Sequence, residues 1–207
     1  MMALDISPSQ STRRTRRSII VGAILSLSVA DHCGLLGRHT NDHSRYDGVV
    51  ATVVHVADGD TFDIDIPDHN ANVTRIRLWG VDCPEIAHGN AQSDAWFGRE
   101  AADFAQEHLE GRRVRVALDP NRGTRGKYSR LLAYVYFEDT DEMFNEALLQ
   151  EGLAYADRRF DHIFEQRFRD LEKRAASGHR GLWENVTTER MPAWRQRMLD
   201  AGFIRGR

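Results

Sequence analysis

Short segments of alternating apolar and polar residues, separated by tight turns, constrain the fold of this chain more than any other feature. Residues 49–56 are rich in β-branched side chains, residues 62–66 alternate with a period of two, and residues 73–79 repeat this pattern. A period of two places successive side chains on opposite faces of a strand, so that one face can be buried. Turn sequences lie between the segments, at residues 58–60 (DGD) and 67–70 (PDHN). The stretch therefore predicts three antiparallel strands.

After this meander the hydrophobic period changes to that of a helix. Apolar side chains recur at helical spacing, each time before a glycine, in three segments: residues 93–110, 142–151 and 160–177. Ser93 or Asp94 is expected to cap the first of these helices. Residues 114–118 and 131–137 have the composition of two further strands. Five strands and three helices in this order predict an α+β fold, a small closed or partly closed β-barrel with helical cover.

The first 30 residues have the composition of a targeting segment. Four arginines precede a mostly apolar run at residues 19–30, which is the order of charge and hydrophobicity in a secretory signal. The run is shorter than the about 20 residues that a membrane-spanning helix needs. We therefore expect a cleaved signal, with Asp31 as the first mature residue, and an exported protein. A short membrane anchor is the alternative.

The segments on either side of the predicted strands and helices are polar. Residues 31–47 have no hydrophobic period and are predicted to be a linker, so that structure begins near Gly48. One domain is expected over residues 48–186, followed by a C-terminal tail at residues 187–207. A few apolar side chains of this tail are spaced so that they could line one face of a short helix: Met191, Trp194, Met198 and Leu199.

Charge and cysteine content exclude several classes of protein. The net charge is −3, and removal of residues 1–30 takes away four arginines and one aspartate, which lowers it to −6. Such a chain lacks the positive field of most nucleic-acid binders, so any site for a polyanion must be local. Cys33 and Cys83 are too few for a disulfide scaffold or a four-cysteine zinc site. We expect a monomer without an obligate protein partner.

Acidic and basic residues in or beside the predicted turns are the candidates for chemistry. Hard carboxylate oxygens suit calcium or magnesium, and four acidic residues are placed to supply them: Asp58, Asp60, Asp82 and Glu85. Taken alone, the DGD sequence is ordinary hairpin chemistry. Arg77 lies on the strand before this acidic group and Arg130 lies before the last strand. Two guanidinium groups there can balance the acidic charge or bind a phosphate.

Three separated motifs, in this order, resemble the staphylococcal nuclease (thermonuclease) family: residues 58–61 (DGDT), 77–85 (RLWGVDCPE) and 127–134 (KYSRLLAY). Residues 151–154 (EGLA) and 181–183 (GLW) are similar to later landmarks of that family. The resemblance covers about two-thirds of the chain. It implies an OB-fold, a five-stranded barrel with three helices, and a calcium-dependent phosphodiesterase that acts on DNA and RNA.

The resemblance also implies a calcium site. The two calcium carboxylates of the family correspond to Asp60 and Asp82, and its third protein ligand, a backbone carbonyl, corresponds to Cys83. The family has threonine where Cys83 stands, but a main-chain oxygen does not depend on the side chain. Asp58 matches an acidic position behind the metal ligands.

The same comparison of motifs implies the catalytic and substrate-binding residues. The catalytic arginines correspond to Arg77 and Arg130, and the essential glutamate corresponds to Glu85, as general base or water-positioning group. Lys127 and Tyr128 match residues that contact a nucleotide phosphate. A phosphodiester resists attack by water, so cations that hold the transition-state charge and a group that orients water are the chemistry required.

Two departures from the family pattern leave the substrate open. Ser129 replaces a glycine of the family motif. In place of the aromatic residues that stack on bases, the chain has Tyr155, Arg158, Arg159 and Phe160. We expect Arg158 and Arg159 to be a solvated pair at a helix start, with contacts to phosphates as the alternative. The sequence does not choose between DNA and RNA, or between endonuclease and exonuclease action. The alternative function is a non-catalytic OB-fold module that binds nucleic acid or protein.

Overall fold

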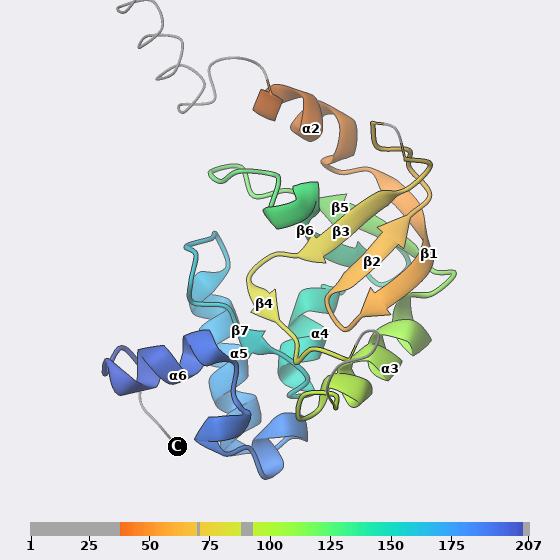
Figure 1. The fold of residues 1–207 in the computed structure, drawn as a ribbon. Helices are drawn as coiled ribbons and strands as arrows, with labels where there is room; N and C mark the ends of the chain where they lie inside the picture. The colour runs from red at the N-terminus through yellow and green to blue at the C-terminus, as the bar shows by residue number, and fades with distance from the viewer. Residues whose placement is uncertain (1–37, 70, 88–92, 205–207) are drawn as a thin grey trace, which may run out of the picture. The chain divides into compact units, whose positions relative to one another are not determined.

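The computed structural model of the chain describes residues 38–69, 71–87 and 93–204 (Figure 1). The chain divides into two units, residues 1–42 and residues 43–207, and the second unit contains the barrel. The predicted signal segment, its cleavage site and Cys33 lie outside the described residues. Within the described ranges, no helix combines the length and the apolarity that crossing a membrane requires.

Five strands close into a barrel in the order β1-β2-β3-β6-β5. Their bounds are β1 Val50–Asp58, β2 Thr61–Ile64, β3 Thr74–Leu78, β5 Arg113–Ala117 and β6 Leu131–Phe137. Neighbouring strands are antiparallel except β3 and β6, which are parallel, and β5 returns to pair with β1. A small five-stranded barrel with appended helices is the OB-fold architecture. The predicted α+β fold class is therefore confirmed.

The three predicted helices are present with shorter bounds, and two more helices accompany them among the described residues. The helices are α2 Arg38–Tyr46, α3 Gly98–Leu109, α4 Phe144–Gln150, α5 Glu165–Ser177 and α6 Ala193–Asp200. Short 3-10 turns occur at Lys127–Ser129, Gly181–Glu184 and Thr188–Arg190. Outside the barrel, β4 (Val81–Asp82) pairs with β7 (Tyr155–Ala156). This two-residue pair was not predicted, because two residues are too short to display a period of two.

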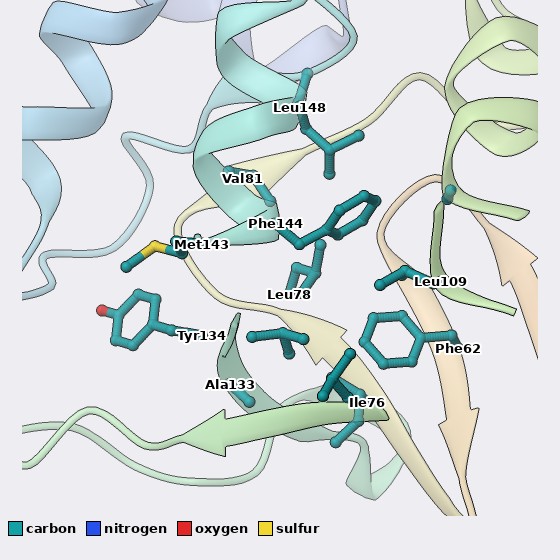
Figure 2. Packing of buried hydrophobic residues seen from close by; sticks show 14 of the residues in the cluster. Phe62, Ile76, Leu78, Val81, Leu109, Ala133, Tyr134, Met143, Phe144 and Leu148 are labelled. Carbon is teal, nitrogen blue, oxygen red and sulfur yellow. The ribbon is translucent and has the colours of Figure 1, made fainter. Parts of the chain in front are cut away.

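The barrel interior is filled by the alternate apolar side chains from which the strands were predicted (Figure 2). Phe62 and Ile76 are fully buried there, and Phe144 and Leu148 of α4 pack into the same core. Complete burial of each such side chain contributes about 1.5–3 kcal/mol. Asn145 hydrogen-bonds α4 to the barrel. Its side-chain oxygen accepts from the backbone N–H of Val135 in β6, and its side-chain nitrogen donates to the carbonyl of Trp79 after β3. Helix α4 is thus fixed to the two strands that lead to the site.

The predicted linker at residues 31–47 is wrong over its second part. Helix α2 occupies residues 38–46, and its last residue, Tyr46, is completely buried. The Tyr46 hydroxyl donates to Asp68 at 3.0 Å and accepts from Thr74 at 3.3 Å. A single aromatic residue in a polar stretch gives no periodic signal, yet it is enough to begin the ordered structure before Gly48.

The predicted cap of the helix that became α3 is also wrong. The helix begins after Phe97, which has a φ of 66° and makes no side-chain capping bond. Asp94 instead accepts from the backbone N–H of Ala87 at 2.7 Å and closes the loop that precedes the helix. Gly98 permits this arrangement, since a Cβ there would come within 2.5 Å of the Glu85 carbonyl oxygen.

The C-terminal segment is part of the packed structure instead of a tail. Trp194 and Arg195 of α6 are each only 6% exposed. Trp194 packs in a second apolar cluster with Tyr155, Leu182 and Trp183. The Arg195 guanidinium donates to the buried Glu172 of α5 at 2.7 Å. The predicted domain boundary at residue 186 therefore falls inside a continuous structure.

Candidate active site

A cleft of about 960 Å³ lies where β3, β4 and the loops before β6 and after β7 meet. Its lining includes most of the candidate residues from the sequence: Arg77, Asp82, Glu85, Lys127, Tyr128 and Arg130. The strand pairing explains the convergence. Thr61 of β2 lies opposite Arg77 of β3, and the parallel β3–β6 register places Leu132, two residues after Arg130, opposite Arg77. Residues distant in the chain are thereby brought to one end of the barrel.

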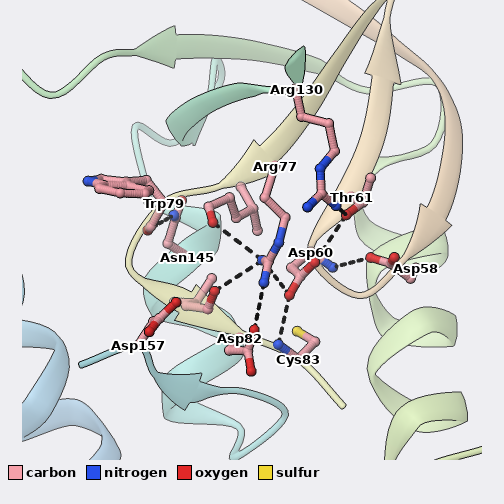
Figure 3. Close-up of polar contacts among 12 residues, drawn as sticks. Asp58, Asp60, Thr61, Arg77, Trp79, Asp82, Cys83, Arg130, Asn145 and Asp157 are labelled. Atoms are coloured by element: carbon pink, nitrogen blue, oxygen red, sulfur yellow. Dashed lines mark hydrogen bonds and ion pairs between the residues drawn. The ribbon is translucent and has the colours of Figure 1, made fainter. Parts of the chain in front are cut away.

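Arg77 is the centre of the cluster (Figure 3). Its Nη1 forms an ion pair with Asp60 Oδ2, and its Nη2 donates to Asp82 Oδ1 at 2.7 Å. Nη1 also donates to the Val81 carbonyl at 3.0 Å. Burial lowers the pKa of Arg77, but the two carboxylates raise it more, so that the guanidinium stays charged. One buried cation thus joins the two predicted metal carboxylates.

Asp60 is buried and held from several sides. The backbone N–H of Cys83 donates to Oδ2 at 2.8 Å, and the Thr61 hydroxyl donates to Oδ1 at 3.1 Å. Asp58 Oδ1 accepts from the backbone N–H of Asp60 at 3.0 Å, which fixes the turn behind it. Burial raises the pKa of Asp60 well above its ordinary value, and the Arg77 charge only partly offsets this. The ionised carboxylate is therefore costly unless further positive charge is near it.

A substitution of Asp60 should reveal this cost. Because its folded-state pKa is raised, Asp60 contributes stability that is fully present below its ordinary pKa of 3.8 and is lost as the pH rises through the raised value. Asp60→Asn cannot ionise. Its amide oxygen can still accept from the Cys83 N–H, and its amide nitrogen can donate to the Thr61 hydroxyl oxygen, which reverses the present bond. We expect the variant to gain stability relative to the wild type as the pH rises from acid to neutral.

Urea unfolding of both proteins in excess chelator measures this difference. The exposed Asp139, which pairs with Arg112 at the surface, supplies the control Asp139→Asn, for which we expect little change with pH. A variant that loses stability relative to the wild type as the pH rises would mean that the Arg77 ion pair outweighs the cost of burial.

Arg130 and its neighbours Lys127 and Tyr128 also line the cleft. Arg130 Nη1 donates to the Thr61 hydroxyl at 3.4 Å and Nε donates to the Lys127 carbonyl at 3.4 Å, both long contacts. Tyr128 is 77% exposed. Tyr128 and Ser129 have φ values of 63° and 58°, in the left-handed region that favours glycine. The turn that carries Arg130 is thus strained at the position where the family motif has a glycine.

Glu85 lies on the loop after β4 and lines the cleft with Arg77 and Arg130. The Ala95 N–H donates to its carbonyl at 2.9 Å, which fixes the backbone of the loop. Partial burial and the nearby Asp58 carboxylate raise the pKa of Glu85, while the two arginines lower it. The side chain is exposed to the cleft and available to a ligand there.

Cys83 has a structural place in the cluster. Its thiol is free and buried, and burial raises the pKa of the thiol well above the ordinary range. A thiol in that state is not a nucleophile at neutral pH. Its backbone N–H bonds to Asp60, so the main chain of Cys83 belongs to the site even though the side chain does not react.

Two residues of the site were missed by sequence reasoning. Arg159 was expected to be solvated, but its Nη2 donates to Asp82 Oδ1 at 2.7 Å and to Asp157 Oδ2 at 2.7 Å. Trp194 Nε1 donates to Asp82 Oδ2 at 2.8 Å. The unpredicted β4–β7 pair places the segment that carries Arg159 beside Asp82. The apolar spacing of the C-terminal segment indicates that Trp194 is buried, but it does not identify Asp82 as the hydrogen-bond partner of its indole.

The neighbouring Arg158 also has a buried partner. Its Nη2 donates to Glu172 Oε2 at 2.8 Å, so the expected solvated pair is wrong for both of its members. Phe160, which follows them, is 53% exposed and stacks on Trp79 with ring centroids 5.6 Å apart. Both rings line the cleft. The cleft therefore offers an aromatic surface beside its charged cluster.

The donor set at the centre of the cleft fits a hard cation. Asp60 and Asp82 are two carboxylates within reach of a single guanidinium, and oxygen donors suit calcium or magnesium. In the part of the chain that the structure describes, no three acidic, histidine or cysteine side chains converge on one point. An ion held here would complete its coordination with backbone oxygen, water or substrate.

Comparison with known proteins gives concordant results. A family model described as staphylococcal nuclease homologue matches residues 75–185. The thermonuclease of Staphylococcus hyicus is 36% identical over 168 residues, which cover 81% of this chain and 95% of that protein. The thermonuclease of Staphylococcus intermedius is 36% identical over 64% of this chain and 74% of its own length. The prophage-derived endonuclease YokF of Bacillus subtilis is 30% identical over 65% of this chain and 44% of its own length.

Proposed function

Because the chain belongs to the staphylococcal nuclease homologue family, we propose that it is a calcium-dependent nuclease that hydrolyses the phosphodiester bonds of DNA and RNA. A nuclease is a hydrolase that acts on ester bonds, and thermonucleases and an endonuclease are among the relatives. The cleft with Arg77 at its centre is the proposed active site.

The observation that carries the proposal is the double contact of Arg77 with Asp60 and Asp82, in a cleft also lined by Glu85 and Arg130. A module that only binds nucleic acid needs the arginines but has no use for two buried carboxylates beside them. Burial of carboxylates costs free energy unless they are paired or hold a cation. The combination therefore favours hydrolysis over binding alone.

Each side chain has a proposed role that follows from its environment. Asp60 and Asp82, with the backbone carbonyl of Cys83, would hold the calcium ion. Bound calcium would polarise the phosphoryl oxygens and offset their negative charge. Arg77 and Arg130 donate to the phosphoryl oxygens and hold the charge that gathers on them in the transition state.

Glu85 acts on the attacking water as general base or as orienting group. It fits this role because it lines the cleft together with the two arginines and its side chain is exposed. Asp58 supports Asp60 through the backbone of the turn. The proton taken from water would go to the Glu85 carboxylate.

Substrate binding is proposed for residues of the cleft outside the carboxylate cluster. Lys127 and Tyr128 are placed to contact a nucleotide phosphate, with the Lys127 ammonium 4.6 Å from the Tyr128 ring centre. The exposed rings of Tyr128 and Phe160 can stack on bases, an interaction worth about 1–3 kcal/mol for each base. Stacking tolerates any base, so this surface suits both DNA and RNA.

Removal of the metal is the experiment that tests the proposal. We expect the purified chain to cleave plasmid DNA, single-stranded DNA and RNA in excess calcium, and to lose this activity in excess chelator. Activity should return when calcium is added back. Cleavage that persists in chelator would contradict the metal-dependent mechanism. Binding of nucleic acid without cleavage in calcium would instead favour the non-catalytic OB-fold module.

We also propose that the protein is exported and acts as a monomer. The arginine-rich start and the apolar run at residues 19–30 support export through a cleaved signal, with a membrane anchor as the alternative. The cleft is built within a single chain, which supports a monomer. A nuclease that works outside the cell does not threaten the nucleic acids of the cell that makes it.

A further inference from the structure

Trp194 contacts the centre of the proposed active site from the C-terminal helix α6. Its indole N–H donates to Asp82 Oδ2 at 2.8 Å, and this contact joins residues 112 positions apart. Asp82 is 9% exposed and Trp194 is 6% exposed. Helix α6 lies beyond residues 75–185, the part of the chain that matches the family model.

The two oxygens of Asp82 have separate partners. Oδ1 accepts from Arg77 Nη2 and from Arg159 Nη2, both at 2.7 Å, whereas Oδ2 accepts from Trp194. Three donors from three segments of the chain therefore fix the plane of this carboxylate. The indole is the donor that restrains Oδ2, and an ionised carboxylate oxygen that accepts one bond can still bind a cation.

Trp194 is held in place independently of its bond to Asp82. Its ring belongs to the apolar cluster that includes Tyr155, Leu182 and Trp183, and the Arg159 guanidinium lies 5.0 Å from the ring centre. The next residue, Arg195, donates to the buried Glu172 at 2.7 Å and fastens α6 to α5. A ring without the N–H would therefore keep its position, so the hydrogen bond and the packing can be separated by substitution.

We infer that Trp194 is a positioning residue of the proposed calcium site, holding the Asp82 carboxylate in the orientation that binds the ion. The inference rests on the proposed function. Donors that orient metal-binding carboxylates typically affect metal affinity by about 10- to 100-fold when they are removed. The C-terminal segment thereby becomes part of the active site.

The test compares Trp194→Phe with a matched control, Trp183→Phe. Both tryptophans belong to the same apolar cluster, but the indole nitrogen of Trp183 has no hydrogen-bond partner in the described part of the chain. Calorimetric titration of the full chain with calcium chloride, without nucleic acid, measures the affinity directly. We expect the Kd for calcium to rise about 10- to 100-fold in Trp194→Phe and to change little in Trp183→Phe.

Two further readouts separate positioning from folding. Urea unfolding in chelator should give similar stability for the two variants, since each loses an indole from the same cluster. In the wild type, calcium should shift the NMR signal of the Trp194 indole N–H, identified by its loss in Trp194→Phe, more than that of Trp183. Unchanged or tighter calcium binding in Trp194→Phe overturns the inference while leaving the proposed function intact. A wild-type chain that neither binds calcium nor cleaves nucleic acid overturns both.

Discussion

Arg77→Ala should lower the turnover of the enzyme about 100- to 1,000-fold, which is the usual effect of removing one donor to a developing oxyanion. The same change should destabilise the fold by about 3–5 kcal/mol, because it leaves the buried Asp60 carboxylate without its cation, while Asp82 keeps Arg159. Both effects follow from the position of Arg77, whose guanidinium contacts Asp60 and Asp82 at once and is only 12% exposed.

Arg77→Lys separates these two effects. The ammonium keeps the positive charge but donates from a single nitrogen, so it cannot reproduce two parallel contacts. We expect it to recover part of the stability and little of the turnover. Steady-state cleavage in calcium and urea unfolding in chelator are the measurements. Arg113→Ala is the control, since Arg113 forms a solvent-exposed pair with Glu138 that should contribute little to stability. A normal turnover in Arg77→Ala would remove Arg77 from the mechanism.

Glu85→Gln should lower turnover about 100- to 10,000-fold, the range associated with loss of a general acid or base. The amide has the shape of the acid but cannot take a proton from water. Because Glu85 is not among the proposed metal ligands, calcium affinity should stay close to that of the wild type. A variant that binds calcium and nucleic acid but does not cleave would separate the roles of Glu85 and of the two aspartates.

The pH dependence of kcat/KM provides an independent check on Glu85. Its pKa is raised by partial burial and by the neighbouring carboxylates, and a general base must be ionised to act. Wild-type activity should therefore increase as the pH rises through this raised pKa. Glu85→Gln should lose this rise in kcat/KM with pH, whereas the surface control Glu138→Gln should keep it. If kcat/KM of Glu85→Gln still rises with pH in the same range, the rise in the wild type is due to another ionisable group.

The barrel and most of the cleft were predictable because they depend on local patterns. β-Branched composition located β1 and alternation located β2 and β3, while the resemblance of three motifs to the nuclease family identified the candidate site residues. The β4–β7 pair gave no such pattern, because each strand has only two residues. This strand pair has a large effect on the site, because it places Arg159 beside Asp82. Arg159, which was expected to be solvated, therefore donates a hydrogen bond to Asp82.

The segments at either end of the domain were missed for a related reason. Tyr46 is a single aromatic residue in polar surroundings and has no period, whereas the apolar spacing around Trp194 indicates a buried helix face but not the partner of its indole N–H. Each is nevertheless buried and bonded through its polar atom to a distant aspartate, Asp68 and Asp82 respectively. Contacts of this kind depend on the assembled tertiary structure, and one sequence does not specify which partner an aromatic N–H or O–H will find.

Closure of the barrel also affects how the protein behaves in concentrated or crowded solution. Because β5 pairs with both β1 and β6, no strand of the barrel is left at an open edge. Open edges are the templates on which chains join edge to edge and aggregate. Among the described residues, the strands outside the barrel are β4 and β7, of two residues each, and they pair with one another. The native fold therefore gives little opportunity for amyloid-like growth.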